Sequence, residues 1–344
     1  MKKKEIFNFS YLAITVVLIF VLSSFSAFSQ TEDFEFYNCK VIKFIVAKSV
    51  GGGFDAYTRA IAPYLEKYLP GATVIVQNIT GGGGLIGINT LYKADPDGLT
   101  IGLMDGAGNV FNQILGVEGV MFDLSKMIWL CRASADPRAM FVNAKTPFYT
   151  IEDMKKANRE IVFTATGVGS DDYYGAAIIF KALGIPLRQV TGFPGAAEAN
   201  LAVVRGEGVD GTECELSSFL QFIEDGSVRP IMVLTRERIG ALPNIPTAIE
   251  VVPQENKKMV QVIINLFESN RILCGPPGIP EGRVAALRVA LEKTFKDPEF
   301  IAWAEKAKRP LDFLTGNQMD EMMKEALQNA EMIKPLLKSL QTKE

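Results

Sequence analysis

The chain has 344 residues, with 36 Lys and Arg against 39 Asp and Glu, which gives a formal net charge of −3 at pH 7. A mildly acidic chain without long basic runs is a poor candidate for nucleic-acid binding. The sequence contains no histidine, which excludes a Ser–His–Asp triad, a Cys–His pair and any metal site that needs a histidine ligand.

The first 29 residues have the pattern of a secretory signal peptide. Lys2–Lys4 precede an apolar run, Tyr11–Leu22, and small residues follow around Ala27 and Ser29. We expect cleavage near Ser29 and a mature protein in the periplasm. The alternative is an uncleaved membrane anchor, but the apolar run is shorter than the roughly 20 residues that span a bilayer.

The first strand after this leader runs into a glycine-rich turn. Lys40–Ala47 is short, apolar and β-branched, which predicts a buried strand. Apolar and aromatic residues at helical spacing follow it, and Asp55 is placed to cap the start of that helix. Gly51–Gly53 therefore lie in a strand-to-helix turn, where bare N–H groups and the helix dipole can hold an anion. A tight turn alone would also explain these glycines.

The same strand–loop–helix unit occurs three more times along the chain. The predicted pieces are Thr73–Gln77, Gly81–Gly84 and Leu85–Lys93; Ile161–Thr166, Gly167–Ser170 and Asp172–Leu183; and the loop Gly192–Gly195 before a helix over Ala196–Arg205. Strands that alternate with helices predict an α/β protein with parallel sheets, whose ligands sit at the carboxyl ends of the strands. The loops form one group early and one group later in the chain, so we expect two α/β lobes with a cleft between them.

These loops carry no cofactor fingerprint. None ends in the G-K-[ST] of a P-loop, and "GVGSDDYYG" lacks a ribose-binding carboxylate about 20 residues further on, so no cofactor is expected. Uncharged backbone donors and a few hydroxyl groups, with no metal, suit a small carboxylate. Cys39, Cys131, Cys214 and Cys274 lie far apart in sequence, and either one or two disulfides or buried free thiols fit this spacing.

Seven motifs, in order from about Lys40 to the C-terminal helix, resemble one protein family. They are "VGGGFD", "GGGGLIG", "ADPDGLTIG", "TGVGSDDYY", "VTGFPG", "GSVRPIMVLTRERIGALPNIPTAIE" and "CGPPGIPEGRVAALRVALEKTFKDPEF". Each is weak alone, but their order and spacing are similar to those of the extracytoplasmic solute receptors of tripartite tricarboxylate transporters, also called Bug-type receptors.

The resemblance implies a type II periplasmic-binding-protein fold, in which two α/β lobes joined by crossover strands close on a carboxylate. We expect the first lobe to comprise residues 30–138 and 255–344, and the second lobe residues 139–254. The first-lobe residues that the resemblance implies for ligand binding are Ser49, Gly52, Gly53, Phe54, Asp55, Gly82, Gly83 and Gly84. The implied second-lobe residues are Thr166, Gly169, Ser170, Asp171, Phe193 and Gly195.

Three departures from the family pattern fall at or beside specificity positions, so the identity of the solute is not inherited. "KSVGGG" stands where many relatives have two prolines, "DDYY" where many have a histidine, and "NLAVV" where many have an aspartate. We expect Lys48 to be solvated at a strand end and Asp172 to cap a helix. If Asp171 faces the cleft, it would repel a plain dicarboxylate and favour a substrate with an amine or a hydroxyl group.

The function that these features imply is that of a periplasmic receptor, with no catalysis, metal or nucleic acid. The receptor, expected to be a monomer, would capture a small carboxylate by hinge closure and present it to the membrane subunits of a tripartite tricarboxylate-type transporter. One alternative is a secreted α/β enzyme that uses the loop serine or a glycine-loop cofactor, although it lacks a histidine base. Another is a carboxylate sensor for a signalling partner, which shares every sequence feature.

Overall fold

The computed structural model describes residues 33–193 and 195–341. Within these residues no helix combines the length and the apolar character needed to cross a bilayer. The predicted signal peptide lies outside the described residues.

The first lobe is built on a six-stranded sheet. Its strands are β1 (Val41–Val46), β2 (Thr73–Asn78), β3 (Thr100–Met104), β4 (Ile128–Arg132), β10 (Ile272–Gly275) and β11 (Leu314–Thr315). Their order across the sheet is β11-β4-β10-β3-β1-β2, with β1 parallel to both β2 and β3 and β10 antiparallel to its neighbours. The parallel strands bring the loops after β1 and β2 to the same edge of the sheet.

The second lobe is built on a five-stranded sheet with the same plan. Its strands are β5 (Arg138–Asn143), β6 (Ile161–Thr164), β7 (Leu187–Val190), β8 (Gly211–Glu215) and β9 (Val228–Leu234). The order is β7-β6-β8-β5-β9, with β6 parallel to β7 and β8 and the entering strand β5 antiparallel between β8 and β9. In the first sheet β10 lies between β3 and β4, and in the second sheet β5 lies between β8 and β9, each antiparallel to both neighbours. This is the type II arrangement predicted from sequence.

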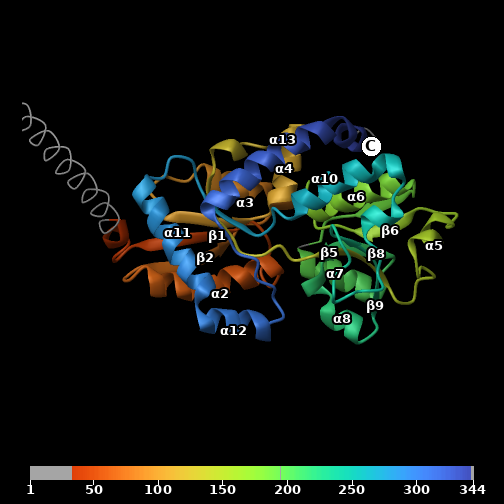
Figure 1. Ribbon diagram of the computed structural model, residues 1–344, viewed down its shortest axis with the longest axis horizontal. Helices are drawn as coiled ribbons and strands as arrows, with labels where there is room; N and C mark the ends of the chain where they lie inside the picture. Colours follow the sequence, from red (N-terminus) through yellow and green to blue (C-terminus); the bar gives the residue numbers. More distant parts are fainter. Residues whose placement is uncertain (1–32, 194, 342–344) are drawn as a thin grey trace, which may run out of the picture.

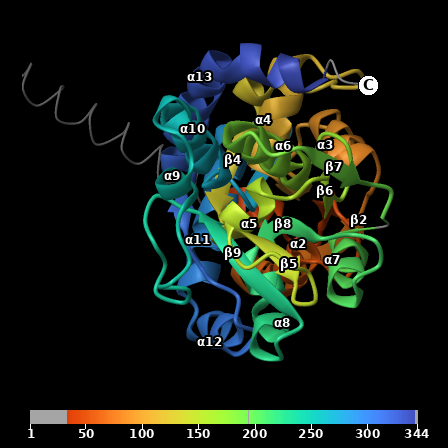
Figure 2. The ribbon, with the colours of Figure 1, turned by 90° about the vertical axis from the view of Figure 1, so that its right-hand side faces the viewer.

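Helices cover both faces of each sheet, and the two lobes lie side by side (Figure 1). The helices are α2 (Gly53–Tyr68), α3 (Leu85–Tyr92), α4 (Gly106–Leu115), α5 (Ile151–Lys155), α6 (Asp171–Leu183), α7 (Ala196–Arg205), α8 (Leu220–Glu224), α9 (Ala248–Val251), α10 (Lys257–Phe267), α11 (Glu281–Lys296), α12 (Pro298–Lys306) and α13 (Gly316–Gln341). Viewed from the second lobe, α7 and α8 lie below the five-stranded sheet, whereas α6 and α10 lie above it (Figure 2).

The lobes share one hydrophobic core on a single side of the molecule. Buried side chains of α4, α6, α10 and α13 form a continuous cluster that includes Phe111 and Tyr174, whose rings lie 5.1 Å apart. Separate clusters fill the opposite face of each sheet. The chain passes directly between the sheets at residues 133–137, which join β4 to β5, and returns through α10 to β10.

Most predicted element boundaries agree with the structure to within one residue. The predicted helix over Ala196–Arg205 is confirmed as α7, and α6 begins one residue earlier than predicted. The expected caps are wrong in detail, because Gly52 and Ser170 occupy the N-cap positions of α2 and α6. Asp55 and Asp172 lie inside the first turns, where their carboxylates accept hydrogen bonds from the preceding loops.

Candidate ligand-binding site

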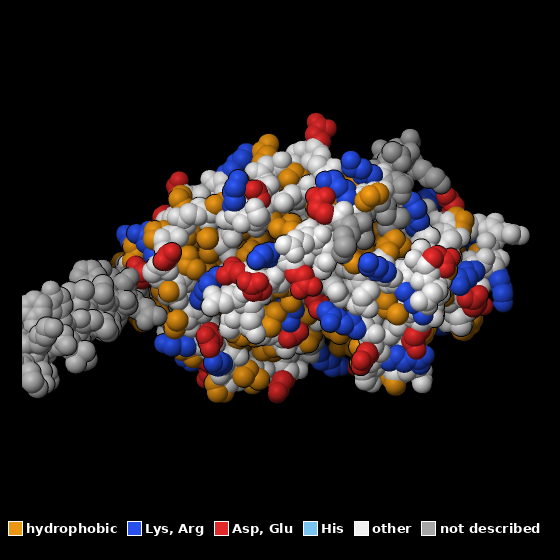
Figure 3. Space-filling view, turned by 45° about the horizontal axis from the view of Figure 1, so that its top comes forward, with side chains coloured by type: hydrophobic (Ala, Val, Ile, Leu, Met, Phe, Trp, Pro, Cys, Tyr) orange, Lys and Arg blue, Asp and Glu red, His pale blue; other side chains and the backbone are white. Residues whose placement is uncertain are grey.

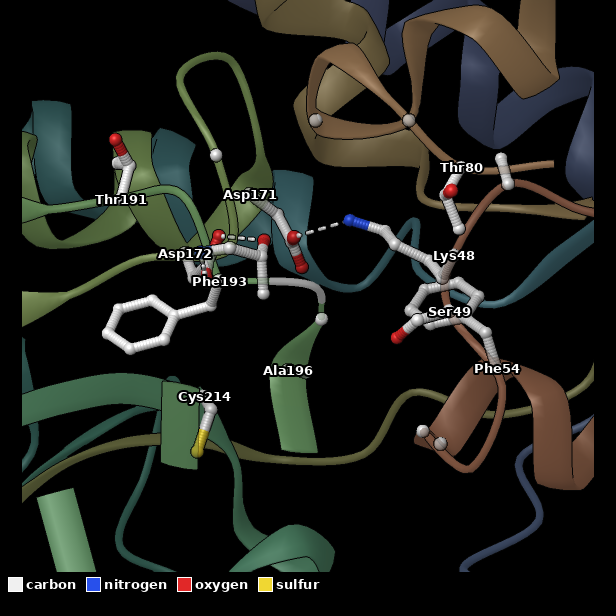
Figure 4. A pocket seen from close by; sticks show the side chains of 18 of the residues that line it. Lys48, Ser49, Phe54, Thr80, Asp171, Asp172, Thr191, Phe193, Ala196 and Cys214 are labelled. Atoms are coloured by element: carbon white, nitrogen blue, oxygen red, sulfur yellow. Dashed lines mark hydrogen bonds and ion pairs between the residues drawn. The ribbon is translucent and has the colours of Figure 1, made fainter. Parts of the chain in front are cut away.

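A cavity of about 450 Å³ lies between the lobes, at the loops that follow the parallel strands. It is in the size range of small-molecule sites. Its lining comes from both lobes: Ala47, Lys48, Ser49, Gly52, Gly53, Phe54, Thr80, Gly81, Gly82, Gly83, Gly84, Arg138, Thr166, Gly167, Val168, Asp171, Asp172, Thr191, Gly192, Phe193, Gly195, Ala196, Asn200, Cys214, Glu215 and Ser218. Phe54 and Phe193 lie on opposite sides of the space (Figure 4).

The first-lobe wall presents backbone groups. The helix α2 starts at Gly53, so the N–H groups of its first turn have no partner within the helix and carry the positive end of its dipole. The carboxylate of Asp55 accepts the Gly51 N–H at 2.9 Å and pairs with Arg59 at 2.9 Å, which fixes the loop from behind. The next loop, Gly82–Gly84, has positive φ at all three residues, a conformation that glycine adopts without strain.

The second-lobe wall is organised by Asp172. Its carboxylate accepts the Thr166 N–H at 2.7 Å and the Thr166 hydroxyl at 2.9 Å, and it also accepts the Ser170 hydroxyl. The fully buried Ser170 hydroxyl lies 2.7 Å from the Gly167 carbonyl oxygen as well. These contacts stabilise the conformation of the loop between β6 and α6. The hydrogen bonds of the Ser170 hydroxyl are therefore made within the loop.

The two walls touch at both rims of the cavity. A Cβ atom added at Gly83 would lie 2.9 Å from the Val168 carbonyl oxygen and 3.2 Å from the Ser170 nitrogen. A Cβ atom added at Gly195 would overlap the Ser49 side chain. Glycine at these two positions therefore permits the lobes to approach, in addition to any role in ligand binding.

Lys48 bridges the lobes at the top of the cavity. Its ammonium nitrogen lies 3.5 Å from Asp171 Oδ1 and 3.8 Å from Asp105 Oδ2, and only 17% of its side chain is exposed. Figure 4 shows it reaching across to Asp171. The expectation that Lys48 is a solvated strand-end residue is therefore wrong, because it is buried against the carboxyl groups of Asp105, the N-cap of α4, and Asp171 in α6.

Arg138, the first residue of β5, is the second cation of the cavity and is almost fully buried. Its Nε and Nη2 donate to both oxygens of Glu213 at 2.6 and 2.8 Å, and its Nη1 donates to Asp171 Oδ2 at 2.5 Å. The same Nη1 lies 3.6 Å from Glu215 Oε1. Arg138 is therefore shared among three carboxylates.

Burial and neighbouring charge shift the ionisation of these groups. Burial, together with Asp171, raises the pKa of Asp105 to about 8. Burial also acts to raise the pKa of Asp171, but Arg138 and Lys48 hold it below its ordinary value. For Lys48, burial acts to lower the pKa, and the two aspartates outweigh it and raise the pKa. Asp105 consequently tends to hold a proton at neutral pH while Asp171 is ionised.

Arg271 lies behind the cavity lining, against the rings of Phe54 and Tyr57. It is fully buried, with its guanidinium 4.9 Å from the Tyr57 ring centroid and 5.6 Å from that of Phe54. Its partners are Asp136 at 3.3 Å and Glu215 at 3.5 Å. Burial acts to raise the pKa of Glu215, but Arg271 and Arg138 together lower it, so this carboxylate is ionised.

Most residues implied by the family resemblance meet at the cavity. The ones that line it are Ser49, Gly52, Gly53, Phe54, Gly82, Gly83, Gly84, Thr166, Asp171, Phe193 and Gly195. Asp55, Gly169 and Ser170 do not line it. Asp55 and Ser170 instead stabilise the loops, and Gly169 accepts a hydrogen bond from Asn112 at 2.9 Å.

The sequence interpretation missed Arg138 and Glu215. A signal was present, since "GTECE" places Glu213 and Glu215 two residues apart on a buried strand, so both point to one face. Two carboxylates on one buried face require a cation, and Arg138 lies opposite Glu215 in the sheet register. Nothing in the sequence reveals that pairing across the sheet.

The cysteines form no disulfide within the described part of the chain. All four cysteines are free, and burial raises the pKa of Cys214, which lines the cavity. Among the described residues, no group of His, Cys, Asp and Glu side chains is arranged to hold a metal ion.

The family model described as "Tripartite tricarboxylate transporter family receptor" matches residues 57–341. A UPF0065 protein from the tcbD–tcbE intergenic region of Pseudomonas sp. strain P51 is 25% identical over 280 residues, which are 79% of each chain. The periplasmic binding protein BugD superimposes with a TM-score of 0.71 at 24% identity, covering 86% of this chain and 97% of BugD. MatC from Rhodopseudomonas palustris with bound malate gives a TM-score of 0.71 at 19% identity, covering 86% and 99% of the two chains.

The likeness to BugD and MatC shows the fold, and the family match spans most of the chain. The two α/β lobes, each with a crossover strand in its sheet, and the cavity at the loops between them agree with both findings. The chain belongs to the tripartite tricarboxylate transporter receptor family and has the two-lobed fold of periplasmic binding proteins.

Proposed function

We propose that this protein is a periplasmic receptor that captures a small carboxylate between its lobes and presents it to the membrane subunits of a tripartite tricarboxylate-type transporter. The observation that carries the proposal is the first-lobe wall of the cavity. There the start of α2 and the Gly82–Gly84 turn offer uncharged backbone donors and the positive end of a helix dipole. An anion is the ligand that such a surface stabilises.

Capture by hinge closure fits the chain path and the contacts between the lobes. Residues 133–137 pass directly between the sheets, and facing loops meet at Gly83 and at Gly195. A ligand that contacts both walls would favour the arrangement in which those loops touch. Malate bound to MatC, a protein of the same fold, supports a carboxylate as the solute class.

Binding without catalysis is supported by the position of the loop serine. Ser170 is the serine that the enzyme alternative would use, but its hydroxyl is buried against Asp172 and the Gly167 carbonyl oxygen. It does not line the cavity, and the sequence offers no histidine to act as its base.

A thermal-shift screen of the purified mature protein tests this function. Small mono- and dicarboxylates should include at least one stabilising compound, whereas nicotinamide dinucleotides and divalent metals should give no shift. A ligand at 100 times its dissociation constant adds about 2.7 kcal/mol, which such a screen detects. A response to a dinucleotide alone would contradict the proposal, and mass spectrometry of the ligand released from natively purified protein would identify the solute.

Export is part of the same proposal. The residues of the predicted leader, 1–29, lie outside the described structure. N-terminal sequencing of protein recovered from the periplasm should give a start near Gln30, and a start at Met1 would instead identify the leader as an anchor.

A further inference from the structure

Both basic side chains that line the cavity already have carboxyl partners within the protein. Lys48 lies within 4 Å of Asp105 and Asp171, and Arg138 is shared among Asp171, Glu213 and Glu215. Among the described lining residues these are the only two bases, against three acids, Asp171, Asp172 and Glu215. The ligand therefore meets backbone donors and the paired Lys48 on the first lobe, and more carboxyl groups than basic groups on the second.

Glu215 is the carboxylate best placed to receive a positive group. It lies at the end of β8, lines the cavity and keeps 13% of its side chain exposed, whereas Glu213 on the same strand is fully buried. Its contacts with Asn270 at 3.3 Å, Arg271 at 3.5 Å and Arg138 at 3.6 Å all involve Oε1. Its Oε2 makes no hydrogen bond with another residue in the described part of the chain.

A second carboxylate on the ligand would be repelled at this end. It would have to enter a partly desolvated space beside Asp171 and Glu215, where like charges interact more strongly than in water. The cations that could receive it are committed to protein carboxylates, and removing either from its partners would leave a buried acid unpaired. A ligand ammonium would instead add a favourable charge to the unpaired oxygen of Glu215.

We propose that the ligand is a monocarboxylate with an ammonium group at its far end. The carboxylate lies at the glycine turns of the first lobe, and the ammonium lies against Glu215, with Asp171 beside it. This inference rests on the proposed function and narrows its substrate class. It distinguishes this chain from MatC, which is described with malate, a dicarboxylate.

Two series of probes that differ only at the far end test the proposal by calorimetry. The first is butyrate, succinate and 4-aminobutyrate, and the second is hexanoate, adipate and 6-aminohexanoate. In at least one series the amino compound should bind at least tenfold more tightly than the dicarboxylate of the same length. Tighter binding of succinate or adipate would overturn the inference while leaving a carboxylate receptor intact. Failure of every carboxylate in both series and in the wider screen would overturn the receptor function itself.

The variant Glu215→Gln assigns the preference to this residue. It should reduce at least tenfold the ratio of the affinity for the amino compound to the affinity for the dicarboxylate. Glu215→Asp, which keeps the charge, should still bind the amino compound more tightly than the dicarboxylate. Glu198→Gln is the matched control, because Glu198 is exposed on the same lobe, does not line the cavity, and loses the same charge. Melting temperatures of all three variants separate lost binding from lost folding. An unchanged ratio in folded Glu215→Gln would overturn the assignment.

Discussion

Gly52 and Gly53 are adjacent in the first turn but face different surroundings. A Cβ atom added at Gly53 would lie 2.9 Å from Arg271 Nη2 and 3.3 Å from Arg309, so bulk there would press on the arginines behind the cavity. At Gly52 the nearest atom would be the Ser49 carbonyl oxygen at 3.7 Å, an ordinary contact. The backbone at Gly52, with φ −76° and ψ 175°, also suits any N-cap residue.

Gly52→Asp and Gly52→Asn form an isosteric pair that tests where the ligand carboxylate sits. Both side chains can cap α2, so neither variant should melt below the wild type. The added negative charge of Gly52→Asp should weaken binding of the best carboxylate from the screen at least tenfold, about 1.4 kcal/mol, relative to Gly52→Asn. Calorimetry on both folded variants measures the difference, and equal affinities would place the carboxylate elsewhere.

Asp105 makes the stability of the protein depend on pH. Its pKa rises from the ordinary value of 3.8 to about 8 in the folded state, so between these values the folded protein binds a proton that the unfolded chain has released. Stability from this group is therefore present at low pH and is lost as the pH rises toward 8. Asn is a good N-cap and mimics the protonated acid, so Asp105→Asn should keep the Gly108 N–H contact.

Asp105→Asn should accordingly flatten the decline in melting temperature between pH 5 and pH 8, by about 3 °C or more. Part of the decline will remain, since burial also raises the pKa of Glu213 to about 8. Asp123→Asn is the control, because Asp123 caps a short helix and its Ser125 contact lowers its pKa, which puts its influence below pH 4. A wild-type slope in Asp105→Asn would show that Asp105 is ionised in the native protein.

At the scale of elements, the glycine loops at Gly83 and Gly195 lead into the helices that follow them and also pack against the opposite lobe. Gly195 shows this most clearly, because its φ of −175° is open to any residue and the Ser49 side chain would overlap a Cβ there, with the flexible Glu198 carboxylate next at 3.3 Å. Gly83, in contrast, combines a positive φ of 67° with the close approach of Val168. Gly195 therefore isolates the contact between lobes from backbone strain.

Gly195→Ala should weaken ligand binding about tenfold, or 1.4 kcal/mol, because the methyl group opposes closure against Ser49. The double variant Gly195→Ala with Ser49→Gly removes the overlapping atoms and should bind within a factor of three of Ser49→Gly alone. The coupling between the two sites, measured by calorimetry on all four proteins, reports the contact directly. Additive effects would show that the loops do not meet in the bound state.

At the scale of the molecule, the lobes are separate sheets that share a core. The helices α4, α6, α10 and α13 lie along one side of the molecule (Figure 1), and their buried side chains form a cluster that is continuous across both lobes. The cavity lies among the loops. Basic and acidic side chains are interspersed over the face shown in Figure 3, as expected for a chain with small net charge. Rotation of one lobe would bend the residue 133–137 connection and shift packing within the shared core.

Small-angle X-ray scattering should detect that rotation. Saturating the protein with the tightest carboxylate from the screen should decrease the radius of gyration relative to the ligand-free protein. At the ligand concentration that just saturates the wild type, Gly52→Asp should keep a radius of gyration closer to that of the ligand-free protein, because it binds the ligand at least tenfold more weakly. An unchanged radius of gyration in wild-type protein at saturation would exclude hinge closure as the mode of capture.

Local sequence patterns determined the element order and the loop positions, and the family resemblance implied 11 of the residues that line the cavity. Glycine after a β-branched run and helical spacing beyond it are properties of neighbouring residues, so the turn before α2 and the helix α7 were predicted correctly. The grouping of the glycine loops predicted two lobes, and the family motifs added the type II fold, which the comparisons support, while the residue boundaries of the lobes stay a prediction.

Only the tertiary structure decided which charges meet. Lys48, Arg138, Asp171 and Glu215 come from four separate segments, and their pairing depends on sheet register and on how the lobes pack. The same packing buries Ser170 and draws Lys48 out of solvent, which reversed two sequence expectations. Local conformation can be predicted from sequence because turn, cap and periodicity preferences depend on residues a few positions apart. Burial and charge pairing cannot, because they arise only when segments distant in sequence come together in one low-dielectric space.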